Sequence, residues 1–236
     1  MEHADQADLV GTLRHRLRAS ALAAALLAGA AAMPGCTLLG GMIESYRQQS
    51  TFAVPAEYVG ISGKSVAVVV IADRSIEADF PGITGTLIDR INNNLRDNAA
   101  PSHAFPSVQL VQYLMNNPQL LVRPRGELAK DLGVERLVVV ELQEFRLNDP
   151  GNQYLWDGVA IGQVAVVEAD GPLPDDYAFA RPVRVAFPDK KGMGPEQFGR
   201  DVVSSALISR FINRTSWFFY EHQEPYYPEP GLGLNR

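Results

Sequence analysis

The stretch Ser65-Val-Ala-Val-Val-Val-Ile-Ala72 decides the fold. Its apolar side chains occupy odd and even positions alike, so the strand that it predicts must be buried on both faces. A second stretch, Arg136-Leu-Val-Val-Val-Glu-Leu-Gln-Glu-Phe145, begins in the same way and ends in an alternation of polar and apolar residues. It predicts a strand that starts at the centre of the sheet and leaves it at an exposed face.

Helical patterns separate these two strands. Apolar residues between Ile83 and Leu95 recur every three or four positions, which predicts an amphipathic helix that ends near Asn98. Shorter helices are expected over 107–117 and 125–132. Because two strands of one sheet that are joined by such a crossover form a right-handed parallel pair, we expect a parallel pair here.

The rest of the chain predicts strands joined by turns and then a helix. The turn sequence Asn148-Asp-Pro-Gly-Asn152 precedes apolar stretches at 159–168 and 177–187, which we interpret as an antiparallel meander. A final helix is expected from Pro195 to about Tyr220. The sequence therefore predicts an α/β fold (α+β mixed sheet), a two-layer or three-layer sandwich. Its central mixed β-sheet would contain a parallel strand pair and a C-terminal antiparallel meander, packed by helices.

The N-terminal residues carry a targeting pattern. Three arginines at positions 14, 16 and 18 precede 15 residues without a charge, from Ala19 to Met33. As a helix this run would be about 22 Å long, shorter than the ~30 Å hydrocarbon core of a bilayer. A basic start, a short apolar run and small residues at its end are typical of a secretory signal. The run is followed by Cys36, the only cysteine of the chain, so no intrachain disulfide can form.

The stretch Met33-Pro-Gly-Cys36 resembles the lipobox of bacterial lipoproteins, in which the cysteine becomes the first mature residue and carries acyl chains. Gly35 fits the family pattern, whereas Met33 and Pro34 stand where the family has leucine and then alanine or serine. The resemblance implies lipid attachment at Cys36, with palmitate-type chains as the membrane anchor. Because Thr37 rather than aspartate follows, it also implies the outer membrane. The alternative is a structural cysteine beside an ordinary signal peptide.

The patterns divide the chain into four parts. These are a lipoprotein-type signal peptide at 1–35, a lipid-anchored tether at 36–64, a single α/β periplasmic domain at 65–220 and an extended tail at 221–236. Glycine and proline interrupt any helical period in the tether, and prolines prevent a helix in the tail. Docking of the aromatic tail onto a partner or onto its own domain is one interpretation of this last segment.

The chain is acidic, with a formal net charge of −6 at pH 7. Removing residues 1–35 takes away three basic and three acidic side chains and leaves this value unchanged. Nucleic-acid-binding proteins need a basic surface, so we expect no nucleic-acid partner. Adhesion to anionic lipid through a polybasic surface is excluded for the same reason. We therefore expect contact with the membrane through acylated Cys36, with a membrane-inserting or oligomerising segment in the tether as the alternative.

Few residues indicate catalysis. His103 and His222 lack a second ligand at metal-binding spacing, and motifs for phosphate binding or an activated serine are missing. Glu141 and Glu144 are three apart in a predicted strand, so we expect them to point to opposite faces, which is wrong for a pair of catalytic carboxylates. We therefore expect no catalytic residue, no metal and no cofactor.

One charged cluster follows the first predicted strand. It contains Asp73 and Arg74, with Glu77 and Asp79 just beyond them. Ligands of open α/β sheets bind outside the carboxyl ends of the strands, so Asp73 and Arg74 are the candidate ligand edge. A solvated charged loop with an Asp–Arg pair is the alternative interpretation.

The layout resembles a group of bacterial envelope lipoproteins. The group includes the curli-secretion channel lipoprotein, the activators of penicillin-binding proteins and the N-terminal domain of the TolB translocation protein. The resemblance covers roughly residues 64–220. The residues that carry it are Ser65-Val-Ala-Val-Val-Val70 and Glu127-Leu-Ala-Lys-Asp-Leu-Gly-Val-Glu-Arg-Leu-Val-Val-Val-Glu-Leu-Gln-Glu-Phe145. Members are adaptors, activators or secretion subunits and generally not enzymes, so the resemblance implies a non-enzymatic role.

We therefore expect a membrane-anchored periplasmic lipoprotein that binds another cell-envelope protein as an adaptor or assembly factor. One alternative is an envelope hydrolase or small-ligand-binding enzyme that uses the strand edge from Asp73 to Asp79. Another is a secretion-channel subunit, which would form a ring-sized homo-oligomer. The chain lacks an obvious long amphipathic insertion for a membrane strand, which disfavours the channel.

Overall fold

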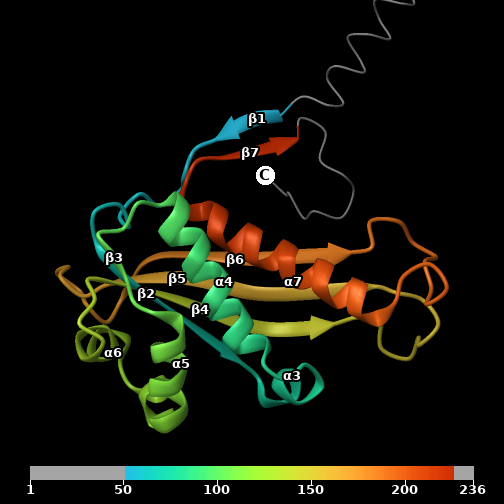
Figure 1. Ribbon diagram of the computed structural model, residues 1–236, viewed down its shortest axis with the longest axis horizontal. Helices are drawn as coiled ribbons and strands as arrows, with labels where there is room; N and C mark the ends of the chain where they lie inside the picture. The colour runs from blue at the N-terminus through green and yellow to red at the C-terminus, as the bar shows by residue number, and fades with distance from the viewer. Residues whose placement is uncertain (1–50, 226–236) are drawn as a thin grey trace, which may run out of the picture. The chain divides into compact units, whose positions relative to one another are not determined.

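A five-stranded mixed sheet in the order β3-β2-β4-β5-β6 is the centre of the computed structural model, which describes residues 51–225 (Figure 1). Strand β2 runs parallel to β3 and β4, whereas β5 is antiparallel to both of its neighbours, β4 and β6. A separate two-stranded antiparallel sheet pairs β1 with β7. The predicted α/β fold with a mixed sheet, a parallel pair and an antiparallel meander is confirmed.

The elements have the following bounds. The strands are β1 (Thr51–Val54), β2 (Ser65–Ala72), β3 (His103–Ala104), β4 (Arg136–Arg146), β5 (Gly158–Glu168), β6 (Tyr177–Phe187) and β7 (His222–Pro225). The α-helices are α3 (Arg74–Asp79), α4 (Ile83–Asn98), α5 (Ser107–Asn116), α6 (Arg125–Asp131) and α7 (Arg200–Ser216). Two 3₁₀ helices are η1 (Pro118–Val122) and η2 (Trp217–Phe219).

The centre of the sheet is buried on both faces, as the sequence predicts. Consecutive side chains of β2 from Val66 to Val70 are at most 1% exposed, and those of β4 from Leu137 to Val140 are equally buried. The two strands pair in parallel with Val66 opposite Arg136. Burial of two adjacent strands on both sides requires packing elements on each face at this level of the sheet.

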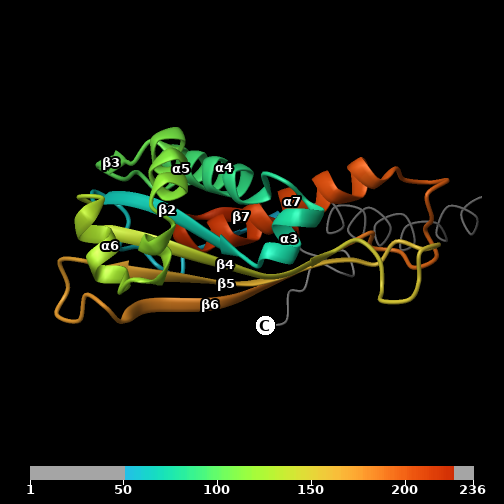
Figure 2. The same cartoon turned by 90° about the horizontal axis from the view of Figure 1, so that it is seen from below.

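Helices α4 and α7 lie side by side on one face of the sheet (Figures 1 and 2). Helix α4 packs over β2, and α7 packs over β5 and β6. A Cβ atom added at Gly162 would lie 3.0 Å from the Phe211 ring of α7, which places Gly162 and its alternate neighbours in β5 on the helix-covered face.

The opposite face is covered at one end only. Helix α6 contacts β4 and β5, and its Leu128 and Ala129 are fully buried. On this face Leu137 and Val139 of β4 are buried, whereas Glu141, the next side chain along, is partly exposed. Cover by η1 and α6 therefore ends at about the middle of β4.

A bulge in β4 changes the direction of its polar side chains. Glu141 pairs with Gln163 of β5, and Glu144 pairs with Ile161, with a register shift between them. Because Gln163 and Ile161 are two residues apart, they share one face, and so do the glutamates opposite them. The prediction that Glu141 and Glu144 point to opposite faces is wrong, since it assumed a strand without the extra residue Gln143.

The segments that come before and after the central sheet along the chain, up to Glu224, belong to the same compact unit as the sheet. β1 lies in the stretch that the sequence analysis assigned to the tether, and β7 lies in the predicted tail. The backbone N–H groups of Glu57 and Tyr58 both donate to the carbonyl of Phe218, at 2.9 Å. Within 51–225 no helix has the length and hydropathy needed to cross a bilayer. The predicted anchor Cys36 lies outside the described residues.

Gly162→Ala should destabilise the fold, because the new Cβ would collide with the carbonyl oxygen of Glu141 and press on the Phe211 ring. We expect a loss of about 1–3 kcal/mol in the free energy of unfolding, the usual cost of overpacking. Urea denaturation measures it. Gly85→Ala in α4 is the matched control. Its Cβ meets nothing within 4 Å, so it should be neutral or stabilising by up to about 1 kcal/mol. Equal effects of the two changes would contradict the packing argument.

Candidate functional site

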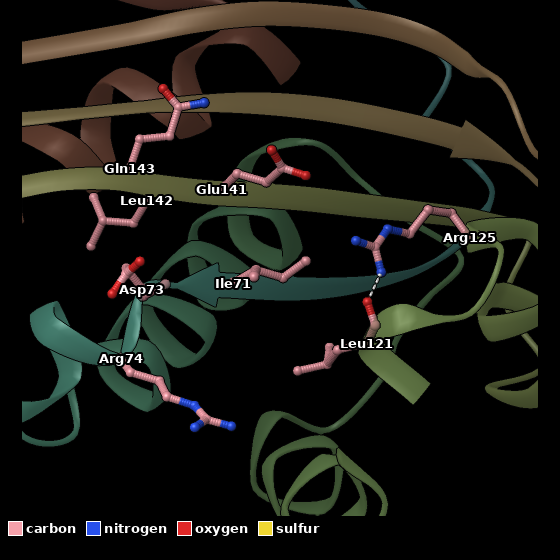
Figure 3. A pocket seen from close by; sticks show the side chains of 9 residues that line it. Ile71, Asp73, Arg74, Leu121, Arg125, Glu141, Leu142 and Gln143 are labelled. Atoms are coloured by element: carbon pink, nitrogen blue, oxygen red, sulfur yellow. Dashed lines mark hydrogen bonds between the residues drawn. The ribbon is translucent and has the colours of Figure 1, made fainter. Parts of the chain in front are cut away.

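A hollow of about 790 Å³ opens beside the carboxyl end of β2 (Figure 3). Three segments line it: the end of β2 with the start of α3, the segment from η1 to α6, and the middle of β4. The hollow lies where the cover provided by η1 and α6 ends. It includes Asp73 and Arg74, the two residues that the sequence analysis placed at a ligand edge, so both lie beside a concave surface.

Asp73 has a structural task at this edge. It is the N-cap of α3, and its Oδ1 accepts hydrogen bonds from the backbone N–H and the hydroxyl of Ser75, both at 2.9 Å. These hydrogen bonds hold the pKa of Asp73 below its usual value. Residues 74–79 are therefore a short helix rather than the charged loop of the alternative interpretation. The Arg74 guanidinium is exposed and has no hydrogen bond or ion pair to the described residues.

Arg125 reaches the hollow from the opposite wall. Its Nη1 donates to the carbonyl oxygen of Leu121 at 2.6 Å, which ties the start of α6 to η1. The next residue, Gly126, lies against the carbonyl of Pro174, where a Cβ atom would not fit. Close packing at Gly126 therefore fixes the start of α6, and with it the position of Arg125. Leu121 supplies an apolar surface beside the Arg125 side chain.

Glu141 projects from β4 into the same space. It lies opposite Ile71 of β2 in the parallel register and is partly exposed. Within 51–225 its carboxylate has no hydrogen-bond or ion-pair partner. Figure 3 shows Glu141 and Arg125 extending toward the same part of the hollow, with Ile71 between them and Asp73. A charged group that is partly removed from water and unpaired favours a ligand of opposite charge.

The sequence analysis missed Leu121, Arg125 and Glu141 as site residues. The first two lie about 50 residues from Asp73 along the chain, and only the packing of η1 and α6 brings them to it. Glu141 did carry a signal. It is the first charged residue after the buried run of β4, and it therefore marks where the cover of the sheet ends.

The lining of the hollow consists of charged, amide and apolar side chains. It contains no histidine, cysteine or serine, so a nucleophile–base pair is missing there. In the described part of the chain no three histidine, cysteine, aspartate or glutamate side chains could hold a metal ion together. What the lining offers is two guanidinium groups, two carboxylates and an apolar floor.

A second exposed surface begins next to the hollow. In the register of the sheet Ile161 lies between Glu144 and Arg184, and Gln163 lies beside Pro182. All five side chains are partly or fully exposed, and they share the face opposite α4 and α7. We call these five residues the open face.

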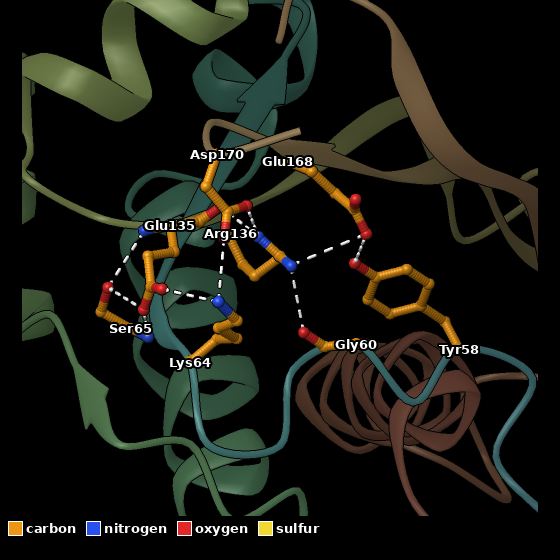
Figure 4. Close-up of polar contacts among 8 residues, drawn as sticks. All are labelled: Tyr58, Gly60, Lys64, Ser65, Glu135, Arg136, Glu168 and Asp170. Carbon is orange, nitrogen blue, oxygen red and sulfur yellow. Dashed lines mark hydrogen bonds and ion pairs between the residues drawn. The ribbon is translucent and has the colours of Figure 1, made fainter. Parts of the chain in front are cut away.

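A polar cluster joins the starts of β2 and β4 to the segment before β2 (Figure 4). The side chain of Arg136 is only 9% exposed, pairs with Asp170 and Glu168, and donates through Nε to the Gly60 carbonyl at 3.1 Å. The Tyr58 hydroxyl donates to Glu168 at 2.6 Å. Burial and this hydrogen bond raise the pKa of Tyr58 well above its usual value.

Lys64 completes the cluster. Its Nζ lies 2.8 Å from Glu135 and 2.9 Å from Asp170. Hydrogen bonds from Lys64 and Arg136 lower the pKa of Asp170 to about 2. Every charged member has a partner of opposite sign, so the cluster fastens residues 58–64 to the domain and has no unpaired group with which to bind a ligand.

Comparison with known proteins gives only distant structural likenesses. No family model and no curated protein matches the sequence. Similar solved structures include lipoprotein GNA1162 from Neisseria meningitidis, with 11% identity over 63% of this chain and 95% of that chain at a TM-score of 0.43. The PelC dodecamer from Paraburkholderia phytofirmans is 13% identical over 72% of this chain and 97% of that chain, with a TM-score of 0.40. Protein XCC0632 from Xanthomonas campestris, of family DUF330, is 11% identical over 70% of this chain and 88% of that chain, with a TM-score of 0.41. Likenesses of this size carry no conclusion about binding or assembly.

Asp170→Asn should remove a pH-dependent contribution to stability. The folded-state pKa of Asp170 is about 2, below the ordinary 3.8, so the unfolded chain binds more protons between these values. The contribution is therefore fully present above about pH 4 and is lost as the pH falls through about 2. Urea unfolding at a series of pH values should show wild type and variant differing most near neutral pH and converging in acid. A difference that does not change with pH would contradict the assigned ion pairs.

Proposed function

We propose that this protein is a lipid-anchored periplasmic adaptor that binds another cell-envelope protein and has no enzymatic activity. The observation that carries the proposal is the open face, whose five side chains are partly or fully exposed on the side of the sheet opposite α4 and α7. The anchor is the part of the proposal that the sequence supports, through the lipobox-like stretch that ends at Cys36.

The composition of the open face supports contact with a protein. Ile161 and Pro182 are apolar, and Glu144, Gln163 and Arg184 surround them with charges of both signs and an amide. A mixture of apolar and polar side chains on a flat surface is typical of non-obligate protein interfaces. A uniformly basic or acidic surface would instead have favoured nucleic acid or cationic ligands.

The edge of the sheet is less suited to binding than its face. β6 is the outermost strand and has 11 residues. It carries Pro182 in its middle and exposed Arg181 and Arg184 on either side. Proline and charged side chains on an edge strand prevent a further strand from pairing with it. We therefore place the partner on the face of β5 and β6 and not along the free edge of β6.

Cys36→Ala should release the protein from the membrane or leave it unprocessed. Two or more acyl chains anchor a protein stably, whereas one chain holds it only marginally. Intact-mass measurement of the wild type should give a chain that starts at Cys36 and carries acyl mass, and fractionation should place it with membranes. An unmodified wild-type chain in the soluble periplasmic fraction would overturn the anchor.

A photo-crosslinking residue placed at Arg184 should capture an envelope protein in intact cells. The same residue at Arg96, which is 58% exposed on helix α4, is the matched control on the helix-covered side. We expect one discrete product from position 184 and none from position 96. Equal capture at both positions would contradict a docking surface on the open face, and a product with the mass of two copies of this chain would replace the adaptor by a homo-oligomer.

A further inference from the structure

We propose that the hollow at the end of β2 binds a small zwitterionic ligand, an α-amino acid or short peptide with an apolar side chain. Its ammonium group would lie at Glu141 and its carboxylate at Arg125. The inference goes beyond the proposed adaptor function, because the residues of the open face are not used in it.

Glu141 provides the cation site. Its carboxylate is partly removed from water and lacks a partner among residues 51–225. The nearby carboxylate of Asp73 is already engaged by Ser75 as a helix cap, so Glu141 is the acid of the hollow with both oxygens available. An ammonium group at this position would supply the charge-assisted hydrogen bonds that the folded chain does not.

Arg125 provides the anion site. One of its terminal nitrogens, Nη1, donates to Leu121, which orients the guanidinium and leaves its other N–H groups without a partner in the described structure. A guanidinium held by one bond retains further donors in a fixed plane, which suits a carboxylate. Arg74 is a second arginine of the lining, but Figure 3 shows its guanidinium directed away from Arg125 and Glu141, so the anion site rests on Arg125.

The arrangement of charges selects a ligand with both signs. A simple anion at Arg125 would also meet the unpaired carboxylate of Glu141, and a simple cation at Glu141 would also meet the guanidinium of Arg125. A zwitterion satisfies both sites and leaves neither repelled. Both groups project toward the same part of the hollow, so one small molecule can reach them together (Figure 3).

The size and the floor of the hollow define the rest of the ligand. Ile71, Leu121 and Leu142 supply apolar surface, which suits an aliphatic side chain. A volume of about 790 Å³ is in the range of small-molecule sites and exceeds what a single amino acid fills. Because the hollow is wide open to solvent, we expect weak binding, with a Kd of roughly 0.1–10 mM.

Titration of the full-length protein with alanyl-leucine tests the proposal. Binding is followed by NMR shifts of the Arg125 Nε–H and the Gln143 side-chain amide. N-acetyl-alanyl-leucine lacks the ammonium group and alanyl-leucine amide lacks the carboxylate. Each should bind the wild type about tenfold more weakly than the parent dipeptide, the size expected for one charge-assisted hydrogen bond. Free leucine as a fourth probe distinguishes an amino-acid site from a peptide site, and binding of either supports the proposal.

Glu141→Gln identifies the group responsible. The variant should bind alanyl-leucine about tenfold more weakly but should bind the acetylated dipeptide as well as the wild type does, because each change removes the same contact. Glu127→Gln, an exposed carboxylate of α6 outside the hollow, should change neither. Acetylation without effect on wild-type binding, or no binding of leucine and dipeptide at tens of millimolar, would overturn the proposal. Neither of these outcomes depends on the folding of a variant.

Discussion

The structure depends on burial of strand β2 on both of its faces. Val66 to Val70 have no side that can face water, so helices must cover the sheet above and below this strand. One face receives α4 and α7, and on the other α6 contacts β4 and β5. The parallel pairing of β2 with β4 follows, because a chain that leaves β2 and returns to its side through a helical crossover must run in the same direction. The polar cluster around Arg136 then closes the amino end of both strands with paired charges in place of apolar contacts.

The hollow lies where β2 ends before β4 does. β2 ends at Ala72, opposite Leu142, whereas β4 continues to Arg146. Beyond this point no strand among residues 51–225 pairs with β4 on the β2 side, and the cover by α6 has also ended. The hollow is the corner that this step leaves, and the open face is the continuation of the uncovered sheet across β5 and β6. The bulge at Gln143 falls at the same step, where loss of the neighbouring strand removes one constraint on the register of β4.

The sequence predicts what depends on local patterns and fails where a side chain depends on a distant partner. The unbroken apolar run at 65–72 was enough for a central strand, and the helical period from Ile83 was enough for α4. Asp73 and Arg74 could be placed at the end of the strand because the end of a buried run is visible in sequence, and their role as a ligand edge stays a prediction. The direction in which Glu144 points is not visible in sequence, since it depends on a bulge defined by pairing with β5. The sequence also could not predict that Arg125 lies beside the hollow, because its position relative to Glu141 depends on how η1 and α6 pack.

The proposed anchor limits where a partner can be. Fourteen residues separate Cys36 from Thr51, the first residue of β1. Fully extended, they span at most about 50 Å, so a chain anchored at Cys36 holds the start of its domain within that distance of the bilayer. Residues 58–64 add no further reach, because Arg136 and Lys64 fasten them to the domain. A net charge of −6 gives the domain no attraction to anionic lipid. With such an anchor the open face would lie within reach of proteins close to the membrane surface, and the charge of the domain would not draw it onto the membrane itself.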